Sequence, residues 1–275
     1  MLRISFFLTF LFFLSCCSSY YKFDEAYDKR DFLKAYNILE TIKKKEDIHY
    51  KVRNYRIILR LSLEGDEDFI LKLSNLTLNN NEIEEALIPY RNFGISFLSY
   101  LNARTAEDYS NTLHLIKDIK NVPSEFESYF YKIKGISEYK TGNYEKALFY
   151  LSTSLKMNSS SDALYFSGMC YLNQRKFKEA KGYFEKILSS TLDNFFNGLA
   201  YFQIAEIYYE EGTYKEAMKY YIKALETYPE IPQFAFKLSK CLNKLNFKFF
   251  AEKFLKVAIR INKDYATAWF YLNIN

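Results

Sequence analysis

Apolar residues recur with helical spacing through the second half of the chain. The pattern is clearest over residues 198–231, where two apolar faces are separated by Gly212 and followed by Pro229. The first face repeats at i, i+3, i+4 and i+7, the spacing of one side of a helix, and comprises Tyr201, Ile204, Ala205 and Tyr208. The second face comprises Tyr214, Ala217, Tyr221 and Ala224. This stretch predicts a hairpin of two helices, in which Gly212 takes a positive φ at the turn and Pro229 ends the second helix.

The same local pattern returns with a nearly constant period. The alanines at 147, 180, 217 and 251 lie 33, 37 and 34 residues apart. A period near 34 residues is typical of stacked helical hairpins. Four copies can be counted, over residues 128–161, 161–194, 198–231 and 232–265. The longer interval indicates a three-residue insertion around residues 194–197.

This pattern resembles the tetratricopeptide repeat (TPR) family, whose motif is W-x2-L-G-x2-Y, then A-x3-F, then P. In the copy at 198–231, Tyr201 stands for the tryptophan, Ala205 for the glycine and Tyr221 for the phenylalanine. The resemblance implies an all-α fold, an α-solenoid of antiparallel helix hairpins that forms the right-handed superhelix of TPR proteins. Residues 266–275 restart the motif, with Trp269 at the family's tryptophan position, and are predicted to form a C-terminal capping helix.

Two copies depart from the motif in ways that change the prediction. The copy at 128–161 has Lys134 and Glu138 where bulky apolar residues are usual, so its first helix is expected to be loosely docked or rotated. The copy at 232–265 has Asn246 at the position of the turn between its two predicted helices, where the copy at 198–231 has Gly212. Asparagine tolerates the left-handed conformation, so Asn246 is expected to replace glycine there.

The N-terminal part is helical in pattern but irregular in period. Residues 16–122 are interpreted as divergent TPR-like helical hairpins, which join the regular array of residues 123–265 without a linker. Thr105 with Asp108, and Ser124 with Glu127, have the spacing of a capping box. Helices are predicted over residues 31–45, 48–63 and 67–78, from near Pro89, and from 105 to 120.

The first seventeen residues have a different character. Arg3 is followed by the apolar run of residues 4–14 and then by Ser15, Cys16 and Cys17. Eleven residues are too few to cross a hydrocarbon core of about 30 Å, so residues 1–15 are predicted to be a cleaved signal peptide. The end of this segment resembles a bacterial lipoprotein signal. That resemblance implies that Cys16, or alternatively Cys17, carries a diacylglyceryl group and acyl chains such as palmitate.

A signal peptide that merely ends in cysteines is the alternative to acylation. The other two cysteines are far apart in the sequence, so the cysteine spacing does not indicate a disulfide framework. Cys170 and Cys241 occupy equivalent positions two repeats apart and are expected to be small buried residues.

Composition and motifs argue against catalysis and nucleic-acid binding. The net charge is only +5 for 275 residues, and basic residues are dispersed among acidic ones. The sequence has no G-x-S-x-G, Walker A, G-x-G-x-x-G or H-E-x-x-H motif, and its cysteines and two histidines lack zinc-site spacing. We therefore expect no enzymatic activity, cofactor, metal, small-molecule substrate or nucleic-acid partner.

The TPR resemblance also implies where a partner binds. In TPR proteins the first helix of each repeat lines a concave groove, so the residues on the face opposite to the packing side are the candidates. The predicted partner-binding residues are Tyr129, Lys132, Tyr139, Tyr165, Met169, Phe202, Glu206, Tyr209, Phe236 and Lys240. Packing against the adjacent repeat, or against a helix from the N-terminal third, is the alternative role for these aromatic side chains.

These features together predict a protein of the bacterial cell envelope, lipid-anchored on the periplasmic face of a membrane or on the cell surface. It would act as a non-catalytic protein–protein interaction scaffold or adaptor, with a protein or peptide in the groove. Two alternatives are a component of the outer-membrane protein assembly machinery and a surface-displayed lipoprotein that contacts host molecules.

Overall fold

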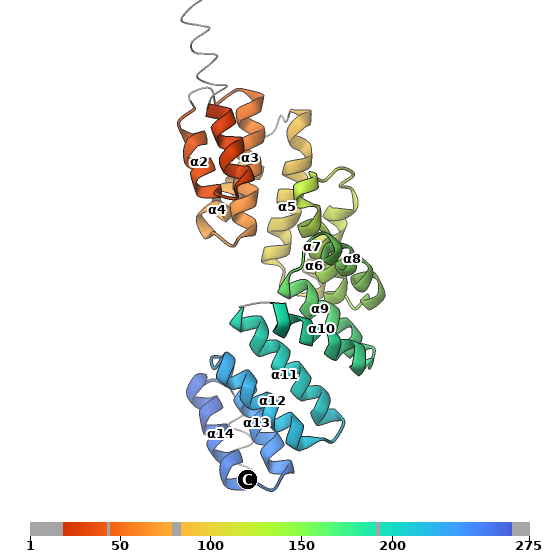
Figure 1. Ribbon diagram of the computed structural model, residues 1–275. Helices are drawn as coiled ribbons and strands as arrows, with labels where there is room; N and C mark the ends of the chain where they lie inside the picture. Colours follow the sequence, from red (N-terminus) through yellow and green to blue (C-terminus); the bar gives the residue numbers. More distant parts are fainter. Residues whose placement is uncertain (1–18, 43–44, 79–83, 191–192, 266–275) are drawn as a thin grey trace, which may run out of the picture. The chain divides into compact units, whose positions relative to one another are not determined.

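The computed structural model describes residues 19–42, 45–78, 84–190 and 193–265. All regular secondary structure in these ranges is helical, so the predicted all-α class of helical hairpins is confirmed (Figure 1). The predicted signal peptide, Cys16, Cys17 and the predicted capping helix at 266–275 lie outside these ranges. Within the described ranges, no helix has the length and apolar character needed to cross a membrane.

The chain divides into two compact units, residues 1–130 and 131–275. Each unit is described separately below. The predicted division between divergent and regular repeats at residues 122 and 123 stays a prediction.

The first unit consists of helices of which some end where the sequence predicts, whereas α2 ends at Glu40 instead of residue 45 and α6 ends at Lys117 instead of residue 120. Residues 19–28 are helical, and α3 and α4 have the bounds that the sequence predicts. Pro89 lies in the first turn of α5, where its missing N–H costs no hydrogen bond. The elements that follow the first helix are α2 (Phe32–Glu40), α3 (Ile48–Leu63), α4 (Glu67–Leu78), η1 (Glu85–Leu87), α5 (Ile88–Asn102), α6 (Ala106–Lys117) and η2 (Ser124–Phe126).

One of the two predicted capping boxes is present. Thr105 and Asp108 satisfy each other's backbone N–H groups at the start of α6. The prediction at Ser124 and Glu127 is wrong, because Ser124 begins the 3-10 helix η2 and Glu127 then opens α7. Pro123 is the N-cap residue of η2 and has no side chain that can cap it, so the 3-10 helix that leads into α7 begins without a side-chain cap.

Arginines on α3 hold the helix at 19–28 and neighbouring segments in place. The guanidinium carbon of Arg56 lies 3.9 Å from the ring centroid of Tyr27, and Arg56 also pairs with Glu125 at 2.7 Å. Arg53 lies 4.7 Å from the ring centroid of Tyr20. Stacking of arginine on an aromatic face is favourable, and more so when the pair is partly desolvated. These contacts explain how short helices of irregular period remain docked.

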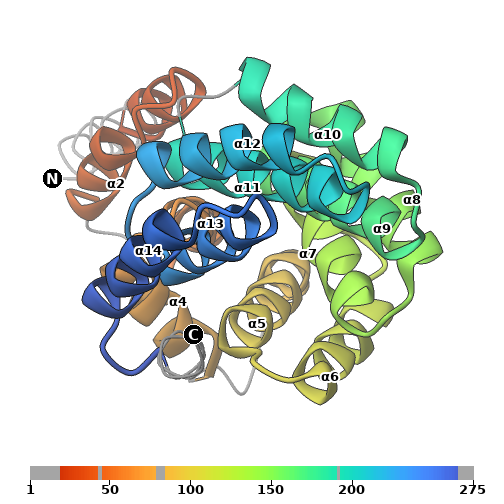
Figure 2. The same cartoon turned by 90° about the horizontal axis from the view of Figure 1, so that it is seen from below.

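The second unit is a series of helical hairpins (Figure 2). Each hairpin joins a first helix to a second helix by a tight turn. The helices are α7 (Glu127–Lys140), α8 (Tyr144–Met157), α9 (Ser161–Asn173), α10 (Phe177–Ser190), α11 (Asn194–Glu210), α12 (Tyr214–Thr227), α13 (Pro232–Lys244) and α14 (Lys248–Ile261). The periodic alanines are almost completely buried on the second helices, where a small side chain lets neighbouring helices pack closely.

All four hairpin turns use one residue in the left-handed conformation. The positions are Gly142, Arg175, Gly212 and Asn246, with φ values of 86°, 57°, 76° and 63°. In each turn, the backbone N–H groups of this residue and of the next one reach back to carbonyls of the last helical turn, as in a Schellman motif. The predictions for Gly212 and Asn246 are confirmed. Arg175 has no sequence signal and adopts a conformation that costs about 1–2 kcal/mol for a residue with a Cβ atom.

The expectation of a loosely docked α7 is wrong. A Cβ atom on Gly135 would lie 2.7 Å from Cγ of Leu151 on α8, so the two helices approach closely. Glu138 is buried but accepts a hydrogen bond of 2.9 Å from Nδ2 of Asn143. The ammonium group of Lys134 lies 4.4 Å from the ring centroid of Tyr150. Both polar residues are therefore accommodated without loosening the hairpin.

The predicted three-residue insertion lengthens α11. This helix has 17 residues, whereas α9 and α13 have 13 each. Asp193 caps the added turn by accepting hydrogen bonds from the backbone N–H groups of Phe195 and Phe196, which matches the preference of aspartate for this position.

Candidate partner-binding groove

The first helices of the second unit form the surface where the predicted groove residues lie. We call the exposed side of α9, α11 and α13 the first-helix face. Three small or apolar positions on α9, Ala163, Leu164 and Gly168, are buried against neighbouring helices. The opposite side carries Tyr165 and Met169, which are half-buried. On α9, this side is therefore the one that keeps exposed surface.

Polar bridges connect successive first helices across this face. Lys132 pairs with Asp162 at 2.8 Å. The amide of Gln203 donates to the hydroxyl of Tyr165 at 3.1 Å. Further along, Lys237 pairs with Glu206 at 2.5 Å. Each bridge joins one repeat to the next, so these side chains fix the register of the stack.

The carboxylate of Glu206 is the centre of the most extended of these bridges. It also accepts a hydrogen bond from the hydroxyl of Tyr221 on α12. Burial, and then the neighbouring Glu206 carboxylate, raises the pKa of Tyr221, so the phenol keeps its proton at neutral pH. Burial, and then Glu206, also raises the pKa of the Cys241 thiol to about 11. Glu206 therefore receives one neutral donor, the Tyr221 hydroxyl, and one charged donor, the Lys237 ammonium group.

Two predicted groove residues lie in the core. Phe202 is 4% exposed and stacks on Phe234 with ring centroids 4.9 Å apart. Phe236 is 5% exposed and packs edge-on against Tyr265. A partner cannot contact these rings without displacing core side chains. These two phenylalanines therefore pack within the stack of repeats, and packing is the alternative role that the sequence left open.

The remaining predicted residues keep some exposed surface. Tyr139 is half-buried, its hydroxyl accepts a hydrogen bond of 3.5 Å from Nδ2 of Asn173, and burial raises its pKa to about 12. Tyr209 and Lys240 are also half-buried, and Tyr209 packs edge-on against Tyr214. Tyr129 belongs to the first unit, where its ring centroid lies 5.4 Å from the guanidinium carbon of Arg60.

A hollow of about 340 Å³ opens between the end of α9 and the face of α11. Its walls include the apolar side chains of Leu172 and Ile207, and its rim carries exposed Arg175 and Glu210. The left-handed turn that places Arg175 at this rim is the feature that sequence reasoning missed. Charges of both signs beside apolar side chains suit a peptide segment better than a single anion or cation.

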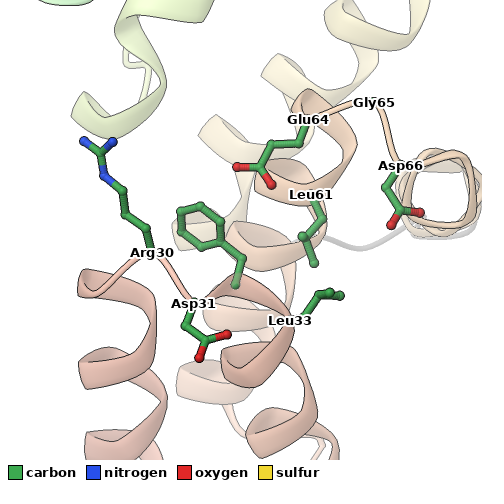
Figure 3. Close-up of a pocket in the computed structure, with 8 residues that line it drawn as sticks. Arg30, Asp31, Leu33, Leu61, Glu64, Gly65 and Asp66 are labelled. Carbon is green, nitrogen blue, oxygen red and sulfur yellow. The ribbon is translucent and has the colours of Figure 1, made fainter.

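The first unit contains a second hollow, of about 490 Å³ (Figure 3). It lies where the turn into α2 meets the turn between α3 and α4, and Arg30, Asp31, Glu64 and Asp66 are among its lining residues. Asp31 and Asp66 already accept backbone hydrogen bonds at the starts of α2 and α4. Glu64 lies 3.5 Å from Nε of Arg60. These carboxylates have structural roles, so the hollow of the second unit is the better candidate site.

Chemical groups for metal binding or thiol chemistry are not assembled in the part of the chain that the structure describes. No group of three or more His, Cys, Asp or Glu side chains is placed there to hold a metal. Cys170 and Cys241 are buried free thiols, as predicted. Burial raises the pKa of Cys170 to about 12, which keeps it protonated and unreactive.

Comparisons with known proteins agree with this architecture. Tetratricopeptide repeat models match residues 134–195 and 199–231, so the predicted repeat family is confirmed for those ranges. A MamA structure from Desulfovibrio magneticus RS-1 has a TM-score of 0.52 at 15% identity, over 63% of this chain and 94% of that one. A MamA RS-1 double mutant gives 0.52 at 16% identity, over 62% and 93%.

A longer solved structure covers more of this chain. The APC/C hetero-tetramer Cut9–Hcn1 has a TM-score of 0.63 at 13% identity, over 91% of this chain and 47% of that one. This chain therefore spans about half the length of that protein. At these identities the likeness concerns the fold. A search of curated protein sequences found no match.

Proposed function

We propose that this chain is a lipid-anchored, non-catalytic scaffold of the bacterial cell envelope, which binds a protein or peptide partner on its first-helix face. The observation that carries the proposal is the hollow between α9 and α11, which lies on a stack of TPR hairpins and combines apolar walls with exposed charges. The Cut9–Hcn1 structure is a hetero-tetramer, so a related fold takes part in subunit assembly there.

Exchanging the charges at the rim of the hollow is expected to weaken partner capture by about tenfold or more, because like charges brought together at an interface cost several kcal/mol. The variant is Arg175→Glu with Glu210→Lys. Both side chains are exposed, so stability should change by no more than about 0.5 kcal/mol. Capture is measured by crosslinking the full chain in its native membrane, followed by purification and quantification of the bound protein.

The matched control exchanges one cation and one anion on α12 instead, as Glu216→Lys with Lys219→Glu. Both residues are exposed and lie on the second helix of a hairpin, and the net charge is again unchanged. Equal capture by the two variants would reject the proposed site.

The proposal of a lipid anchor is based on the sequence around Cys16 and Cys17, which resembles the end of a lipoprotein signal. It is tested by membrane attachment. Replacing Cys16 and Cys17 together with alanine should abolish labelling by an acyl-chain analogue and release the protein into the aqueous fraction, because stable anchoring depends on the acyl chains. The single variants should show which cysteine is acylated. Cys170→Ala is the control that should keep both the label and the membrane association. No label on the wild-type protein, or full retention of the unlabelled double variant in membranes washed with high salt, would disprove the acyl anchor, because high salt weakens any remaining contact that depends on charge.

A further inference from the structure

The last repeat concentrates the positive charge of the chain. Residues 232–265 contain eight basic and two acidic side chains, a net charge of +6, whereas the whole chain carries +5. The preceding repeat, residues 198–231, contains three basic and six acidic side chains, a net charge of −3. Basic and acidic residues are therefore not evenly distributed between neighbouring repeats, although they are interspersed over the chain as a whole.

The same repeat exposes three phenylalanines at one end of its hairpin. Phe247 is 49% exposed, Phe249 is 65% exposed and Phe250 is 52% exposed. They occupy the turn and the first residues of α14, immediately after α13. Exposed phenylalanines side by side on a soluble surface are unusual enough to mark an interaction site.

Exposed lysines flank these phenylalanines along the chain. Lys244 ends α13 and Lys248 begins α14, and both are exposed. The ammonium group of Lys253 lies 4.4 Å from the ring centroid of Phe249. We call the three phenylalanines and these three lysines the basic aromatic patch. Apolar rings beside flexible cations are the combination that binds the boundary between anionic headgroups and acyl chains.

We propose that the basic aromatic patch docks on an anionic lipid surface. The phenylalanines enter the headgroup boundary and the lysines pair with lipid phosphates or carboxylates. This contact is separate from the acyl anchor, which lies at the other end of the sequence, and from the first-helix face. It is therefore a second membrane contact, and neither of the other two proposals depends on it.

The acidic repeat of a second copy is the competing occupant, and the exposed side chains argue against it. Residues 198–231 supply a net negative charge but include none of the large hydrophobic side chains that are exposed in the described structure. Pairing with that repeat would satisfy the lysines and leave the three rings without an apolar environment. A lipid surface satisfies both requirements.

The decisive experiment places a reporter in the patch. Full chain carrying Cys16→Ala, Cys17→Ala, Trp269→Phe and Phe250→Trp is mixed with phosphatidylglycerol vesicles that contain brominated acyl chains. Because brominated chains quench only indoles that are close to them, we expect strong quenching of the introduced indole. The control carries Phe149→Trp in place of Phe250→Trp. Phe149 is 64% exposed on α8, outside the patch, and its indole should stay unquenched.

Charge removal provides the quantitative test. Each lysine near an anionic surface contributes about a fivefold change in affinity, so Lys244→Gln, Lys248→Gln and Lys253→Gln together should weaken vesicle binding about 100-fold. Binding should also fall with added salt and with phosphatidylcholine vesicles. Equal quenching at both positions, no quenching at either, or a concentration-dependent change in the fluorescence of the patch reporter without lipid would overturn the proposal. The last of these outcomes would assign the patch to self-association.

Discussion

Replacing Phe234 with alanine is expected to lower the free energy of unfolding by about 3–5 kcal/mol, the range for removing a phenylalanine from a core. Its side chain is 1% exposed and lies in a cluster with residues of α11 and α12, including Phe202 and Tyr221. Because Phe234 belongs to α13, this ring connects the last hairpin to the one before it. The loss therefore falls on the interface between two repeats.

The loss of stability in Phe234→Ala is expected to be confined mainly to the last hairpin. In a repeat array each unit is stabilised mainly by its neighbours, so weakening this interface should open α13 and α14 before the rest of the unit. Hydrogen exchange of the full chain should show faster exchange in α13 and α14 with little change in α9 and α10. Phe249→Ala is the matched control, because Phe249 is on the same hairpin but 65% exposed, and it should change stability by at most about 0.5 kcal/mol. A Phe234→Ala variant as stable as this control would show that the interface does not hold the last hairpin.

The periodic part of the fold could be predicted from the sequence because its strongest constraints are local. Ala217 must be small where two helices of one hairpin meet, and Gly212 must turn the chain five residues earlier. The alanine recurs in all four copies and a glycine or asparagine at the turn recurs in three, which leaves a visible pattern. Arg175 shows the limit of this reasoning, since the hairpin is stabilised enough to hold an ordinary residue in a left-handed turn. Neither its conformation nor its place at the rim of the hollow has a sequence signal.

The site could be predicted only in part, for a related reason. The helical period correctly indicates which side of α11 is opposite to the packing face, but it does not show what the next repeat places against that side. Glu206 pairs with Lys237, 31 residues later, and Phe202 is covered by Phe234. Both partners come from the following first helix, so availability to a ligand depends on how the repeats stack. Such contacts between repeats have no fixed spacing in the sequence.

Two glycines of one hairpin are expected to respond to the same substitution with opposite signs. Gly182→Ala on α10 should raise the free energy of unfolding by about 0.5–1 kcal/mol, because alanine favours a helix and nothing lies within 4 Å of the added Cβ atom. Gly168→Ala on α9 should lower it by about 1–3 kcal/mol, the cost of overpacking. There the added atom would lie 2.6 Å from the ring of Phe184. That ring is completely buried and packs on Tyr165, so it has little room to move.

Chemical denaturation of the two variants, followed by circular dichroism, measures this difference directly. The double variant Gly168→Ala with Phe184→Leu tests the cause, because a smaller side chain on α10 makes room for the new methyl group. It should be more stable than the sum of the two single effects predicts, since residues in contact are not additive. Similar stabilisation at Gly168 and Gly182 would mean that α9 and α10 do not approach as closely as the structure shows. The close approach at Gly168 would then not be what holds this repeat together.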